Sequence, residues 1–145
     1  MLNLLSGINS TSAALEAERI RMEVISQNIA NANISRGPDG KPYQRQEVVF
    51  ENLLNGQLGL AGSSNGAPKS VQVARVVNDE RPGRLVHVPG HPDADGNGMV
   101  LMPNVNIHEE MVDLIAASRA FEANLAVVKN SRAMALQTLA LGKRG

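Results

Sequence analysis

The stretch that most resembles a chemical site is a short acidic loop, Asp93-Ala-Asp-Gly-Asn-Gly98. Oxygen-bearing side chains stand at its first, third and fifth positions and a glycine at its sixth, as in the first half of an EF-hand calcium loop. The twelfth position of such a loop is a bidentate glutamate, but here it is Asn104, and Pro103 also interrupts the loop. We therefore expect a tight turn held by Asx hydrogen bonds, with no metal site.

The histidines and serines do not form a better candidate for a metal or catalytic site. His87, His91 and His108 are separated by proline and glycine turns and include no helical i, i+4 pair, whereas a metal site needs three or four converging ligands. The serines in helical patterns have no adjacent base to activate them, and no glycine-rich phosphate loop leads from a strand into a helix. The sequence therefore favours a protein that is not an enzyme, with no catalytic, cofactor-binding or metal-ligating residues.

The amino-acid composition excludes further functional classes. The net charge is zero and the pI is near 6.8, so no basic surface for nucleic acid or an anionic membrane is predicted. Tyr43, Phe50 and Phe121 are the only aromatic residues, which is few for a ligand pocket, so no small-molecule substrate is expected. The absence of cysteine excludes disulfides and thiol chemistry. The first residues lack the pattern of a cleaved secretory signal, so we expect a cytoplasmic protein or one exported without such a signal.

Residues 104–141 predict one long helix. This stretch contains no proline and no glycine, because it lies between Pro103 and Gly142. Asn106 can act as N-cap with Glu109 completing a capping box, and Gly142 is expected at C′. The helix would contain about 36 residues and extend roughly 54 Å. Its apolar and small residues recur in steps of four and three, as in a coiled coil, at Ile107, Met111, Leu114, Ser118, Phe121, Leu125, Val128, Ala135 and Leu139. A second face of valines, alanines and Met134 predicts more than one neighbour.

Residues 4–33 predict a second long helix. Its seam is apolar except at Thr11 and Glu18, and the run of asparagines at 28, 31 and 33 should end it before the turn at Gly37-Pro38-Asp39-Gly40.

The middle of the chain changes character. All seven prolines and ten of the thirteen glycines lie between Gly37 and Pro103. Strands are predicted at Gln46–Glu51, Ser70–Val77, Arg84–Val88 and Met99–Met102, with a Gly/Ser/Asn loop at 55–68. The expected fold is mainly α with a small β insertion. The two terminal helices should pair as an antiparallel coiled coil, and the middle should be Gly/Pro-rich and contain β structure. We expect an N-terminal helix at 1–36, a middle region at 37–102 and a C-terminal helix at 103–145, with the two helices forming one helical domain.

Several motifs resemble the signatures of bacterial flagellar axial proteins, the family of rod, hook and hook-associated proteins. Residues 26–35 (SQNIANANIS) and 43–45 (YQR) are similar to the N-terminal signature. Residues 104–115 (NVNIHEEMVDLI) and 118–124 (SRAFEAN) are similar to the C-terminal one. The length and the stretch at 89–95 (PGHPDAD) resemble the FlgC family of proximal-rod proteins. The resemblance extends over nearly the whole chain.

Two sets of residues follow from these patterns. The helix seams predict an assembly interface at Ile8, Leu15, Met22, Ile25, Ile29, Met111, Leu114, Phe121, Leu125 and Val128. The resemblance assigns the axial signature to Asn28, Asn31, Tyr43, Arg45, Asn104, Glu109, Glu110, Arg119 and Asn124.

The resemblance implies a structural subunit of the flagellar basal-body rod, which polymerises through its terminal helices into the periplasmic shaft that carries torque from the membrane ring to the hook. It implies as partners further copies of the chain, other rod proteins, membrane-ring and rod-base adapter proteins, and the flagellar type III export apparatus. Heterologous contacts between apolar helix faces would build such a polymer. The alternative is a soluble coiled-coil adapter that forms a dimer.

Overall fold

The computed structural model describes the chain at residues 2–53 and 70–142, with side chains from residue 10 onward except at 52–53, 70–72 and 74. The elements in chain order are α1 (Leu2–Asn31), β1 (Gln46–Leu53), β2 (Ser70–Asn78), β3 (Arg84–His87), β4 (Met99–Met102) and α2 (Ile107–Gly142). The fold is thus mainly helical with a small antiparallel β insertion, as predicted. The expected loop at 55–68 and the side chain of Ile8 lie outside the described residues.

The end of α1 follows from its asparagines. The helix ends at Asn31, two residues before the predicted end, in a turn where the amide of Ile34 donates to the carbonyl of Asn31. The Asn31 side chain donates back to the carbonyl of Gln27 at 2.8 Å, one turn earlier, which ties the side chain to the end of the helix. A tight loop follows, in which Gly40 has a φ of 72° that glycine adopts at no steric cost.

The start of α2 has a variant of the predicted capping box. The amide of His108 donates to the Oδ1 of Asn106 at 3.2 Å, which is an N-cap bond. Glu109 accepts from the Asn106 side-chain amide at 3.0 Å, where a standard capping box would use the Asn106 backbone amide. At the other end, the prediction that Gly142 lies beyond the helix was wrong by one residue, because α2 includes it.

The strands form two separate antiparallel hairpins. β1 pairs with β2 from Gln46 opposite Asn78 to Leu53 opposite Ser70, with a bulge between Val49 and Phe50. β3 pairs with β4 from Arg84 opposite Met102 to His87 opposite Met99. The predicted strands match these four within two residues at each end.

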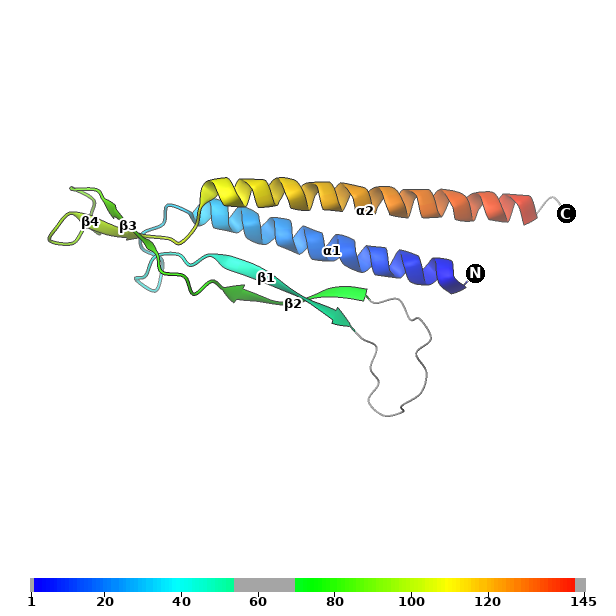
Figure 1. The fold of residues 1–145 in the computed structure, drawn as a ribbon, viewed down its shortest axis with the longest axis horizontal. Coiled ribbons are helices and arrows are strands. Elements are labelled where there is room, and N and C mark those ends of the chain that lie inside the picture. The colour runs from blue at the N-terminus through cyan, green and yellow to red at the C-terminus, as the bar shows by residue number, and fades with distance from the viewer. Residues whose placement is uncertain (1, 54–69, 143–145) are drawn as a thin grey trace, which may run out of the picture.

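α1 lies between the other two long elements (Figure 1). α2 runs antiparallel along one side of it and contacts it, and the β1–β2 hairpin lies against the other side. β3 and β4 extend beyond the start of α2. Ala17, Val24 and Ile25 of α1 are buried, and so is Ala32, which directly follows it.

The seam of α2 that faces the protein is rotated from the predicted one. Its buried or half-buried residues include a four–three repeat at 110, 114, 117, 121, 124, 128, 131 and 135, and the half-buried residues 113, 118, 120 and 125 lie beside it. The predicted Leu114, Phe121, Leu125 and Val128 are half-buried, whereas the fully buried residues of α2 are Glu110 and Ala117. The predicted Met111 is 52% exposed, so it does not lie between the two helices. The apolar spacing missed this rotation because polar Glu110 and Asn124 occupy positions on the inner face.

The N-cap provides a test of how α2 begins. Asn106→Ala removes the bond to the amide of His108 and the link to Glu109, so we expect the free energy of unfolding to fall by about 1 kcal/mol. Asn130→Ala, at an exposed position in the middle of the same helix, is the control and should leave stability equal or slightly higher. Thermal denaturation followed by circular dichroism measures both. Equal losses in the two variants would show that the cap contributes nothing.

Candidate functional site

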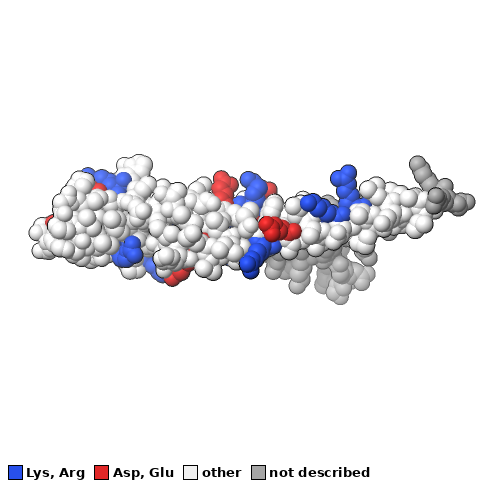
Figure 2. Space-filling view, turned by 90° about the horizontal axis from the view of Figure 1, so that it is seen from above, with Lys and Arg blue, Asp and Glu red and all other residues white. Residues whose placement is uncertain are grey.

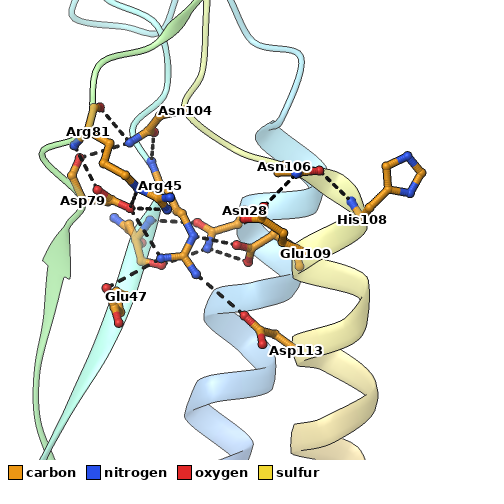
Figure 3. A network of polar contacts seen from close by, with 12 residues as sticks. Asn28, Arg45, Glu47, Asp79, Arg81, Asn104, Asn106, His108, Glu109 and Asp113 are labelled. Carbon is orange, nitrogen blue, oxygen red and sulfur yellow. Dashed lines mark hydrogen bonds and ion pairs between the residues drawn. The ribbon is translucent and has the colours of Figure 1, made fainter.

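A buried polar junction lies where α1, β1 and α2 meet (Figure 3). At its centre is Asn28, which is fully buried. Its side-chain amide donates to the carbonyl of Gln46 at 2.8 Å and to the Oε2 of Glu110 at 3.0 Å. Its Oδ1 accepts from the hydroxyl of Tyr43 and from the amide of Gln46, both at 2.9 Å. Every hydrogen-bonding position of the side chain is thus used, which removes the penalty of burying it.

Arg45 completes the junction from the start of β1. Its Nε donates to the Oε1 of Glu110 at 2.6 Å, and the Glu110 side chain is 1% exposed. The Glu110 carboxylate of α2 therefore accepts hydrogen bonds from Asn28 of α1 and from Arg45 beside β1. A buried charge is tolerated only with such partners. The junction consequently fixes the axial register of three elements against each other.

Four carboxylates surround Arg45. Besides Glu110, its guanidinium lies 3.6 Å from Glu47, 3.6 Å from Asp79 and 3.9 Å from Asp113. Partial burial alone would lower the pKa of Arg45, but the hydrogen bond and charge of Glu110, together with Glu47 and Asp79, outweigh it and raise that pKa. Burial raises the pKa of Tyr43, whose hydroxyl donates to Asn28.

Asn104 ties the chain leading into α2 to the same place. Its Oδ1 accepts from the amide of Arg45 at 2.7 Å, and its Nδ2 donates to the carbonyls of Asp79 and Arg81. Asp79 donates its amide to the carbonyl of Arg45, which extends the β1–β2 ladder by one pair. The hydrogen bond from Arg81 holds the pKa of Asp79 below its ordinary value. The entry to α2 is therefore bonded to the residue before β1 and to the segment after β2.

The junction gathers part of the predicted signature. Asn28, Tyr43, Arg45, Asn104 and Glu110 all belong to it, although the sequence separates them by up to 82 residues. The remaining signature residues serve elsewhere: Asn31 at the end of α1, Glu109 at the cap of α2, and Arg119 and Asn124 further along α2. Asp79 was not predicted. The only indication in the sequence was its position. Asp79 directly follows β2 and lies opposite Arg45, which directly precedes β1.

The acidic loop is a turn and its two aspartates face different partners. The Oδ1 of Asp95 accepts from the amides of Asn97 and Met99, as in an Asx turn. Asp93 instead accepts from the hydroxyl of Ser35 at 2.8 Å and lies 3.1 Å from Arg36. Among residues 2–53 and 70–142, no group of three His, Asp or Glu side chains is placed to hold a metal ion.

Comparison with known sequences places two parts of the chain in flagellar families. Residues 8–38 match a family described as flagella basal body rod protein, and residues 97–141 match one described as flagellar basal body rod FlgEFG protein C-terminal. The chain is also similar to flagellar basal-body rod proteins FlgC along nearly its whole length. It is 44% identical to that of Borreliella burgdorferi, covering 97% of this chain and 98% of the relative. Its identity to that of Salmonella typhimurium is 39%, with the same coverage. It is 35% identical to that of Bacillus subtilis, covering 94% and 96%.

The chain belongs to the FlgC family. The two matched segments meet at the junction, because the first contains Asn28 and the second contains Asn104 and Glu110. Tyr43 and Arg45, which lie between the matched segments in sequence, join them in the structure. The site of this FlgC chain is thus a structural junction, and its chemistry is that of hydrogen bonding and charge compensation.

The junction can be tested by separating its charges. Arg45→Gln leaves Glu110 buried without a cation, so we expect a loss of about 3–5 kcal/mol in the free energy of unfolding. Adding Glu110→Gln should restore part of that loss, because a neutral amide can still bond to Asn28. Arg19→Gln breaks an ion pair with Glu16 on the exposed side of α1 and should have no measurable effect. Urea denaturation of the wild type, the single variants Arg45→Gln and Glu110→Gln, and the double variant measures the coupling, and additive losses would show that Arg45 and Glu110 act independently.

Proposed function

We propose that this FlgC chain is a structural subunit of the flagellar basal-body rod that assembles through its two long helices. The observation that carries the proposal is the outward side of α2. Large apolar residues are exposed along it, with Val112 at 66%, Ile115 at 55% and Val127 at 50%. A soluble monomer rarely leaves such a stripe uncovered, so it is suited to contacts with neighbouring subunits.

The exposed charges differ between the two helices. On the outer face of α1, Glu16, Arg19 and Glu23 pair with one another. On α2, Arg119, Glu122 and Lys129 have no ion-pair partner within the described ranges. Charges that are free in the subunit and interspersed with exposed apolar residues can pair across an interface and select its register. α2 is therefore the helix we expect neighbouring subunits to contact most.

The remaining features of the proposal concern the larger assembly. Residues 1–36 and 103–145 act as one helical domain that packs as a coiled coil, and residues 37–102 form the middle region. Of the predicted helix-seam residues, the exposed Met111 is the one we place in the assembly interface, whereas Ile25, Leu114, Phe121 and Val128 are buried or half-buried within the subunit. The shaft crosses the periplasm and carries torque to the hook. The partners are other rod proteins, ring and adapter proteins, and the type III export apparatus, which accepts the chain without a cleaved signal. Neither described helix has an 18-residue window apolar enough to cross a membrane. The dimeric adapter is the less favoured alternative, because the relatives are named as rod proteins.

A charge on the outward side of α2 tests the proposal. Ile115 is exposed in the subunit, so Ile115→Asp should leave helix content and unfolding unchanged. In an assembly the same change buries an unpaired carboxylate at every copy of the interface, which costs several kcal/mol each time. We expect cells that carry this variant in place of their own FlgC to lose swimming and to lack hooks. The measurements are soft-agar motility and electron microscopy of basal bodies.

Gln27→Glu is the matched control, because it adds the same charge at an exposed polar position of α1, away from the outward side of α2. It should retain motility. His91→Ala addresses the enzyme alternative and should also swim. Normal rods with Ile115→Asp, together with loss of motility from His91→Ala, would contradict the proposal.

A further inference from the structure

All the sulfur of this chain is carried by methionine. The sequence contains six methionines and no cysteine. The structure describes the side chains of Met22, Met99 and Met102, which are half-buried. It also describes Met111 and Met134 on α2, which are 52% and 53% exposed. In the subunit, these two thioethers of α2 are therefore open to solvent, whereas the other three are partly covered.

Met111 lies on the outward side of α2. The inner side of the helix at this level is formed by Glu110 and Leu114. Val112, at 66% exposure, follows Met111, and Ile115, at 55%, lies one turn further along the same side. Under the proposed function neighbouring subunits cover this side of the helix. On assembly the thioether of Met111 therefore moves from water into an apolar contact.

Met134 lies near the other end of the same helix. Val127, two turns earlier on the same side, is 50% exposed. α2 carries no charged residue after Arg132, and Figure 2 shows this end of the helix largely free of charge. A neighbour that covers Met134 therefore contacts an uncharged surface with an exposed thioether in it, as it does around Met111.

An exposed thioether can be oxidised to the sulfoxide by a peroxide. A sulfur–oxygen bond forms while the O–O bond of hydrogen peroxide breaks and its second oxygen leaves as water, so the sulfur is oxidised and the peroxide is reduced. The flexible apolar side chain becomes a polar one that accepts hydrogen bonds. In the free subunit water supplies the donor. In an apolar contact no donor is present, so burial of the sulfoxide is unfavourable.

We propose that Met111 and Met134 are sites of reversible oxidation that decide whether the subunit can join the rod. The inference rests on the proposed function. The reduced chain presents an apolar surface to its neighbours, whereas a chain with sulfoxides at these positions presents polar groups that the contact would desolvate. Assembly in turn protects the two sulfurs, because the contact that a sulfoxide weakens also covers them. A methionine sulfoxide reductase returns the free subunit to its reduced form.

Oxidation kinetics test the two positions directly. The purified full-length chain and isolated basal bodies are treated with the same dilute hydrogen peroxide, and mass spectrometry of peptides measures the sulfoxide at each methionine. In the free chain we expect Met111 and Met134 to be oxidised about twofold or more faster than Met22, Met99 and Met102, because they are more exposed. In basal bodies their rates should fall to those of the half-buried methionines or below. Equal rates at all five positions in the free chain would contradict the inference.

A pair of double variants tests the effect on assembly. Met111→Gln with Met134→Gln places an uncharged polar side chain of similar length at both positions, and Met111→Leu with Met134→Leu keeps both positions apolar. Both positions are exposed in the subunit, so circular dichroism and thermal unfolding should be unchanged in each variant. In cells that lack their own FlgC we expect the Gln variant to lose hooks and swimming and the Leu variant to retain them. Normal hooks with the Gln variant would overturn the inference.

The outcomes separate this inference from the proposed function. Basal bodies that contain the unmodified chain, but in which Met111 and Met134 are oxidised as fast as in the free chain, would overturn the inference and leave the rod assignment standing. Absence of the unmodified chain from the basal bodies that it restores would instead count against the rod assignment.

Discussion

The fold depends on one buried carboxylate. Glu110 is covered on all sides and accepts from Asn28 of α1 and from Arg45 beside β1. A buried ion pair adds little net stability, because desolvation offsets the attraction. Its stronger effect is to destabilise other registers of the helix pair. Any sliding of α1 against α2 would leave a buried charge and a buried amide without partners. Apolar seams alone tolerate such sliding, because one leucine can replace another. The junction therefore gives the helix pair a single register.

That register matters for a subunit whose useful surfaces lie far from the junction. α2 alone is 36 residues long, so its two ends are about 50 Å apart. A shift of one turn at the junction would move the far end of α2 by about 5 Å along α1. In a repeating assembly this displacement would recur at every subunit. Rigid coupling of the helices to the hairpin thus sets the positions of surfaces that the junction never touches.

Much of the architecture could be predicted from the sequence because it depends on local signals. Proline and glycine mark where the helices cannot continue, and Asn106 marks where α2 begins. The rotation of the seam could not be predicted in this way. Asn28 and Glu110 are polar, so apolar periodicity does not indicate them, although both are fully buried where the two helices meet. Resemblance to a family marked both residues, but gave no reason for them. The reason is a set of hydrogen bonds that join residues 18 to 82 positions apart, and such pairs have no local signal.

The exposed apolar residues of α2 are explained by contacts with neighbouring subunits and not by packing within one subunit. Within the subunit, α1 is covered on two sides and α2 on one, although α2 carries more large apolar side chains. The burial of apolar surface is the main favourable term in association, so the less covered helix gains most from neighbours. Unpaired charges and exposed apolar residues are interspersed on that helix. A neighbouring subunit must therefore pair the charges and cover the apolar residues at the same time, which limits both its identity and its register. The buried polar groups thus fix the arrangement of elements within the subunit, whereas its exposed apolar groups become buried only in contact with neighbouring subunits.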